Sequence, residues 1–83
     1  MRQIKSLDEL KQMCEGLTMD FFIQLNFARS SKQISYNSGQ DKFYILNEID
    51  GTRQKLNSKH IMDRRYTNIG YAITQGSLYS YED

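Results

Sequence analysis

The ten residues Met19-Asp20-Phe21-Phe22-Ile23-Gln24-Leu25-Asn26-Phe27-Ala28 carry the clearest structural signal in the chain. Phe21 begins an apolar series at every second position, continued by Ile23, Leu25 and Phe27. The alternate positions are Asp20, Phe22, Gln24 and Asn26, and all of them except Phe22 are polar. A period of two in aromatic and β-branched residues is typical of a strand with one face on a core. We therefore predict a half-buried strand over residues 19–28.

Turn residues separate this segment from three further predicted strands, at residues 33–37, 42–49 and 52–56. Residues 28–32 and 37–41 are polar and are predicted to be turns. The 42–49 strand has apolar groups on both faces, with Phe43, Ile45 and Ile49 on one, so a central position is expected. Asp50-Gly51 predicts a two-residue hairpin, because such turns need positive φ at both positions.

Helix signals flank these strands. Ser6-Leu7-Asp8-Glu9 is a capping box, in which the Ser6 hydroxyl accepts from the amide three residues on and Glu9 reaches back to the Ser6 amide. The predicted helix covers residues 7–15 and stops at Gly16. Asn57 or Ser58 is expected to cap a short helix ending near residue 63.

Thr67 is expected to cap a second C-terminal helix, which ends at Gly76. Residues 78–81 follow as an edge strand. Gly70 falls inside that helix, where glycine is unfavourable, so we expect close packing there, or else close approach of a partner. The predicted fold class is α+β: an antiparallel four- to five-stranded β-meander with an N-terminal helix and two short C-terminal helices, in the order α-β-β-β-β-α-α-β.

The 83 residues suffice for one domain, residues 1–83, and its core. No apolar run is long enough to span a membrane, and the N-terminal residues lack the apolar region of a secretory signal. The chain has one cysteine, so no internal disulfide is expected, and a cytoplasmic location fits best. A small core favours a marginal monomer or a homodimer.

Catalytic and metal-binding patterns are missing from the sequence. One cysteine, Cys14, and one histidine, His60, do not make a closed zinc site, and no phosphate-binding glycine motif occurs. His60 has Asp63 three residues further on, an arrangement that suits a general base oriented by a carboxylate. The expected interpretation is instead an exposed helix histidine that pairs with this carboxylate. Cys14 is expected to be a small core residue. We therefore expect no enzyme activity, no metal and no cofactor.

Two groups of residues are candidates for binding. The first is Arg29, Ser30, Ser31 and Lys32, predicted to lie at a hairpin tip. Two cations around two hydroxyls can hold a phosphate or a carboxylate there, and the alternative is a solvated turn. The second group joins five cations to two aromatic rings, namely Arg53, Lys55, Lys59, Arg64, Arg65, Tyr66 and Tyr71.

The second group suits phosphate contacts with base stacking, or else a solvated basic face balanced by nearby carboxylates. Residues 29–65 hold eight basic and four acidic side chains, a modest excess of positive charge. The chain has six tyrosines, and Tyr79 and Tyr81 alternate near its C-terminus. Tyrosines serve both at interfaces and at the rim of a small core, and both interpretations stay open.

Several segments together resemble small, uncharacterised proteins of bacteriophages and bacterial integrative elements. They are Asp20-Phe21-Phe22-Ile23-Gln24-Leu25-Asn26, Arg29-Ser30-Ser31-Lys32, Phe43-Tyr44-Ile45-Leu46-Asn47-Glu48-Ile49-Asp50 and Tyr66-Thr67-Asn68-Ile69-Gly70. This chain departs from the family at Phe27-Ala28, where relatives have glycines. The resemblance implies a setting in which short proteins bind and block host machinery, and it implies no catalytic residues.

These observations favour a non-enzymatic binding protein that occupies a surface on a host protein or protein–nucleic acid complex. An anti-CRISPR or anti-restriction inhibitor is its specific form. The alternative is a direct nucleic-acid-binding module that uses the basic 29–65 region. Convergence of the cations on one face would favour nucleic acid, and their dispersal would favour a protein partner.

Overall fold

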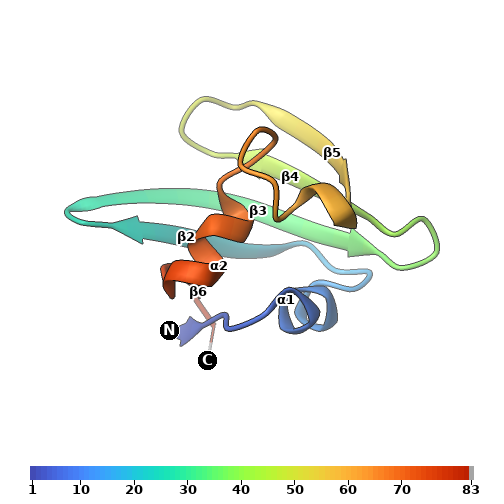
Figure 1. Ribbon diagram of the computed structural model, residues 1–83, viewed down its shortest axis with the longest axis horizontal. Coiled ribbons are helices and arrows are strands. Elements are labelled where there is room, and N and C mark those ends of the chain that lie inside the picture. Colours follow the sequence, from blue (N-terminus) through green and yellow to red (C-terminus); the bar gives the residue numbers. More distant parts are fainter. Residues whose placement is uncertain (83) are drawn as a thin grey trace.

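The computed structural model describes residues 1–82, and within them the chain forms one antiparallel sheet of six strands in the order β1-β6-β2-β3-β4-β5. The strands are β1 (Arg2–Gln3), β2 (Met19–Leu25), β3 (Ala28–Asn37), β4 (Lys42–Asn47), β5 (Arg53–Asn57) and β6 (Leu78–Ser80). The helices are α1 (Leu7–Met13), the 3₁₀ helix η1 (Ser58–His60) and α2 (Ile69–Gln75). Figure 1 shows the long β2–β3 hairpin extending past both α-helices. The predicted α+β class is confirmed.

The core lies between one face of the sheet and the two α-helices. Strand residues Phe21, Ile34 and Phe43 are fully buried there. Leu10 of α1 and Ile69 of α2 belong to the same cluster, so both helices cover the same face. The alternation of residues 19–28 therefore predicted the correct core face for Phe21 and Ile23.

The first hairpin differs from the prediction. Leu25 pairs with Ala28, so the turn is Asn26-Phe27 and residues 28–32 are strand rather than turn. Asn26 takes a left-handed φ of 55°, which asparagine tolerates better than most residues. The first residues of β3 lie where the hairpin extends past the helices, beside Leu25, which is 41% exposed, and the fully exposed Phe27, whereas Lys32 is buried. Arg29 and its neighbours are therefore not at the tip.

The second hairpin is also longer than predicted. Strand β4 ends at Asn47, and the loop closes through Asn47 N donating to Thr52 O at 2.8 Å. Gly51 alone has positive φ in this loop, so Asp50-Gly51 is not a two-residue turn. Ile49, predicted to share a strand face with Phe43 and Ile45, lies in the loop instead and is 74% exposed. Strand β4 pairs with β3 and β5 and is not central in the sheet.

The C-terminal strand is not at the sheet edge. Strand β6 lies between β1 and β2, so only β2 to β5 form a meander and β1 was missed by the sequence analysis. The first predicted C-terminal helix shrinks to the 3₁₀ turn η1. Asn68 occupies the position before α2 but makes no side-chain capping bond, whereas Thr67 Oγ1 accepts from Ile69 N at 3.4 Å. The helix ends at Gly76 with φ 70° as predicted.

Helix α1 begins as predicted, with Glu9 N donating to Ser6 Oγ at 3.1 Å. The Glu9 carboxylate accepts from Lys5 N at 2.8 Å instead of the Ser6 amide. The helix ends two residues early, because Cys14 O accepts from Tyr36 N at 2.9 Å and Gly16 N donates back to Tyr36 O. Backbone pairing with β3 therefore ends the helix.

Gly70 is explained by packing, as expected. A Cβ there would lie 2.4 Å from Met62 Cα and 2.5 Å from Ile61 O. Gly70 N donates to Ile61 O at 3.0 Å, so the start of α2 is tied to the segment that precedes it. This contact helps to fix the position of residues 61–68, of which residues 64–68 border the polar cleft described below.

Candidate functional site

The sheet has a second face, opposite α1 and α2, which we call the open face. It consists of the strand residues that alternate with the core positions in the observed register. Aromatic side chains lie on it in several strands, and they are Phe22, Tyr44 and Tyr79. A polar, solvated face does not need aromatic residues, so these rings distinguish this face from a solvated surface.

One aromatic cluster joins three strands of the open face. The Phe22 ring stacks on Tyr79 at 5.3 Å between ring centroids and meets Tyr81 at 4.7 Å. The Arg29 guanidinium lies 4.1 Å from the centroid of the Phe22 ring. Tyr81 is held in turn by a 3.0 Å hydrogen bond between its hydroxyl and Ser31 Oγ. Phe22 is therefore only 1% exposed although it is on the side away from the core.

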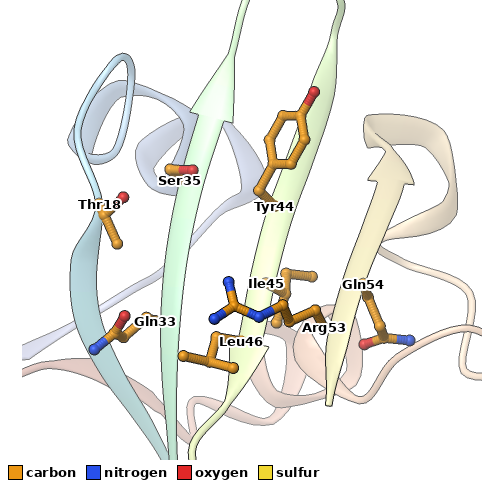
Figure 2. A pocket seen from close by; sticks show the side chains of 8 residues that line it. All are labelled: Thr18, Gln33, Ser35, Tyr44, Ile45, Leu46, Arg53 and Gln54. Carbon is orange, nitrogen blue, oxygen red and sulfur yellow. The ribbon is translucent and has the colours of Figure 1, made fainter. Parts of the chain in front are cut away.

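A shallow hollow of about 250 Å³ lies beside this cluster, over β3, β4 and β5. Its wall includes Gln33, Ser35, Tyr44, Leu46 and Arg53. In Figure 2 the Arg53 side chain reaches from β5 across β4 toward Leu46, and the Tyr44 ring stands at the opposite end. The hollow thus offers an apolar floor with a cation and a phenol at its ends.

The charge of the open face is mainly positive. Its charged strand residues are Asp20, Arg29, Lys42, Arg53 and Lys55. Within residues 1–82 none of these side chains forms an ion pair. Lys55 instead lies 5.5 Å from the centroid of the Tyr44 ring. No carboxylate of the described residues therefore neutralises the cations of this face by an ion pair.

A polar cleft of about 320 Å³ lies on the other side of the sheet, between the β4–β5 loop and the segment before α2. Lys32 borders it from β3 and is only 9% exposed. Its ammonium donates to Asn47 Oδ1, a residue directly across the strand pair. Burial lowers the pKa of Lys32, and the neighbouring Asp50 carboxylate acts in the opposite direction.

The predicted binding residues do not converge on one surface. Four lie on the open face, and they are Arg29, Ser31, Arg53 and Lys55. Ser30 and Lys32 point to the opposite side of β3, because neighbours in a strand alternate. Four others border the polar cleft, and they are Lys32, Arg64, Arg65 and Tyr66.

The remaining two predicted residues have separate places. Lys59 borders a small depression with Gln40 and Asn57. The ring of Tyr71 lies under the Arg64 guanidinium, 4.0 Å from its centroid. The cluster around Phe22 was not predicted, because β6 was expected at the sheet edge and the pairing of Phe22 with Tyr79 has no local sequence signal.

The residues considered for catalysis make contacts within the fold. His60 stacks on Tyr66 at 4.3 Å, and Asp63 bonds Arg65 instead, which lowers the pKa of Asp63 to about 2. The buried Cys14 thiol donates to Leu10 O at 2.9 Å, and burial raises its pKa to about 12. In the part of the chain that the structure describes, no three His, Cys, Asp or Glu side chains gather to hold a metal ion.

No helix among residues 1–82 is long and apolar enough to cross a membrane. No protein-family model matches this chain, and no solved structure matches it.

Proposed function

We propose that this chain is a non-enzymatic binding module that covers an acidic surface of a partner protein with the open face of its sheet. One observation carries the proposal: an ordered cluster of aromatic rings and an arginine lies beside a hollow, on the face opposite the helices. The core does not require these aromatic residues, because Phe21 and Ile23 already fill the other face of the same strand.

The residue types of this face are those that dominate binding energy at protein interfaces. Tyrosine and arginine are enriched among such residues, and a tyrosine side chain loses little conformational entropy when it is covered. Here Phe22 holds Arg29 and Tyr81 in place before any partner arrives. Side chains that are already ordered lower the entropic cost of association.

The charges define the chemistry of the partner. Arg29, Arg53 and Lys55 are unpaired cations on a face where Asp20 is the acidic strand residue. Complementary charge favours encounter and correct orientation, so the partner surface should carry carboxylates. Leu46 on the floor of the hollow favours an apolar side chain at the centre of that surface.

Direct nucleic-acid binding is the second candidate, and Tyr44 is its basis. Its ring is 36% exposed and lies beside Lys55, as a stacking platform would require. Phe22 offers no such platform, because it is 1% exposed and Arg29 covers its ring. Lys32, Arg64 and Arg65 border the polar cleft on the opposite side of the sheet. The cations of the chain are therefore divided between two sides and form no continuous basic track along the open face. The protein partner is therefore the better-supported candidate.

The resemblance to proteins of mobile elements favours one form of this function, the inhibition of a host-defence complex. In that form the open face blocks a surface that the host complex needs. It requires no catalytic residue.

The test is affinity purification with a matched pair of charge reversals. Tagged wild-type chain, Arg53→Glu and Lys59→Glu are each used to capture proteins from a lysate of the encoding organism. Arg53 lines the hollow of the open face, whereas Lys59 lies in η1 and does not line it. We expect one partner to be recovered by wild type and Lys59→Glu, and its affinity for Arg53→Glu to fall at least about tenfold with purified components.

Equal recovery by all three chains, or no partner above background, would contradict the proposal. Thermal unfolding by circular dichroism is the control that checks whether both variants are folded. The nucleic-acid alternative is measured with a labelled single-stranded oligonucleotide at two salt concentrations. A steep loss of affinity with salt supports that alternative, and binding that is absent at low salt excludes it.

A further inference from the structure

The polar cleft on the helix side of the sheet is a separate site, independent of the open face. Its walls come from segments far apart in the chain. Lys32 and Asn47 come from β3 and β4, and Arg64, Thr67 and Asn68 from the segment before α2. The cleft holds about 320 Å³, which is at the lower end of the range for small-molecule sites.

Lys32 is the unusual member of this cleft. Its side chain is 9% exposed, and a buried ammonium group loses most of its hydration. Asn47 Oδ1 accepts one of the three N–H bonds that the ammonium can donate. Among residues 1–82 no carboxylate forms an ion pair with Lys32, although Asp50 is near enough to affect it. A buried charge with this little compensation favours an anion beside it.

Arg64 supplies a second available cation. Its guanidinium lies 4.0 Å from the centroid of the Tyr71 ring, and stacking leaves the N–H groups at its edge free to donate. Arg65 differs, because it bonds both oxygens of Asp63 at distances between 2.7 and 3.2 Å. The uncompensated positive charge of the cleft is therefore at Lys32 and Arg64.

Neutral donors complete the wall. The Asn68 side chain makes no capping bond to α2, so its amide group can turn to the cleft. Thr67 Oγ1 accepts from Ile69 N at 3.4 Å, which leaves its hydroxyl hydrogen to donate. The Asp50 carboxylate is held in its own loop by Thr52 N at 3.0 Å and Thr52 Oγ1 at 2.8 Å. Donors outnumber acceptors around the space.

We propose that this cleft binds the phosphate group of a small phosphorylated molecule, with Lys32 and Arg64 as the charged contacts. A phosphate monoester has three acceptor oxygens and nearly two negative charges at neutral pH, which match two cations and several neutral donors. A carboxylate has two oxygens and one charge and would leave donors unused. Tyr66 borders the cleft and is 42% exposed, so it can cover the organic part of the ligand.

The test is a titration of isotopically labelled protein with inorganic phosphate, pyrophosphate and adenosine monophosphate, followed by amide NMR shifts. We expect saturable shifts at Lys32, Arg64, Thr67 and Asn68 with at least one of the three. Tighter binding of adenosine monophosphate than of inorganic phosphate would show that the nucleoside part of the ligand also contributes. Equal affinity for the two would show that the phosphate group alone is recognised, and both results support the proposal.

Two variants and a control separate specific binding from general attraction. Arg64→Gln is a surface change that should not affect folding, and it should weaken binding at least tenfold. Lys32→Met keeps the length of the side chain and should abolish saturable binding. Lys59→Gln removes a cation outside the cleft and should leave the dissociation constant unchanged.

Three results would overturn the proposal. One is a dissociation constant weaker than about 10 mM for all three probes. Another is an unchanged constant in Arg64→Gln, which stays informative even if Lys32→Met does not fold. The third is binding of an oligonucleotide without binding of the mononucleotide, because that describes a nucleic-acid surface instead.

Discussion

Replacing Gly70 by alanine tests how tightly the start of α2 packs against the segment that precedes it. The new Cβ would lie 2.4 Å from Met62 Cα and 2.5 Å from Ile61 O. Both neighbours are backbone atoms, so no side chain can rotate away to make room. To reach an ordinary contact of 3.4 Å, the Met62 backbone has to move by about 1.0 Å. That movement also lengthens the 3.0 Å hydrogen bond from Gly70 N to Ile61 O.

The free energy of the change has three parts. Overpacking a close contact costs about 1–3 kcal/mol, and weakening the hydrogen bond costs up to about 1 kcal/mol. Alanine is favoured over glycine in a helix by up to about 1 kcal/mol, which opposes them. We expect a net destabilisation of about 2 kcal/mol. For a domain of this size that corresponds to a fall in Tm of about 8–16 °C.

The assay is thermal unfolding by circular dichroism, with Gly39→Ala as the control. A Cβ at Gly39 meets the Asn37 side chain at 3.3 Å, and a side chain can adjust. We expect that control to change stability by less than about 0.5 kcal/mol. A Tm for Gly70→Ala equal to or above that of the wild type would refute the reasoning, because helix propensity would then outweigh the packing.

Two further predictions concern titratable groups. Arg65 lowers the pKa of Asp63 from 3.8 to about 2, so its contribution to stability is complete above pH 3.8 and is lost as the pH falls through about 2. Asp63→Asn should therefore flatten the dependence of Tm on pH between these values, and an unchanged slope would show that the pair does not act on folding. Burial raises the pKa of Cys14 to about 12, so a thiol reagent at pH 8 should label it only as the protein unfolds. Labelling of the native chain as fast as free cysteine would contradict its buried place in the core.

Local signals were the reliable part of the sequence analysis. The Ser6 cap and the Gly76 stop both occur where they were predicted. Phe21 and Ile23 share the core face, as their alternation indicated. These features depend on hydrogen bonds or side-chain directions within a few residues, and such short-range physics is visible in the sequence.

Predictions failed where the environment of a segment depended on distant parts of the chain. Residues 28–32 are polar, which is typical of a turn, but they are strand at an end of the hairpin that the helices do not reach. Ile49 is apolar, but it lies in a loop and not on the core face. Composition alone does not distinguish a solvated strand from a turn.

The candidate surfaces show the same division. The cationic and aromatic residues of both surfaces were visible in the sequence, but their grouping was not. Arg29 and Lys32 were expected together at one tip, and the strand alternation places them on opposite sides of the sheet. Lys32 instead shares a cleft with Arg64, which is thirty-two positions further along the chain.

The sequence was sufficient for the α+β class, the helix caps and the core face of β2, because each depends on contacts between near neighbours. The tertiary structure was needed for the insertion of β6 between β1 and β2. That insertion brings Tyr79 against Phe22 and so builds the aromatic cluster of the open face. Which strands pair depends on how the whole sheet is buried, and the sequence of a single strand does not specify its partner strand.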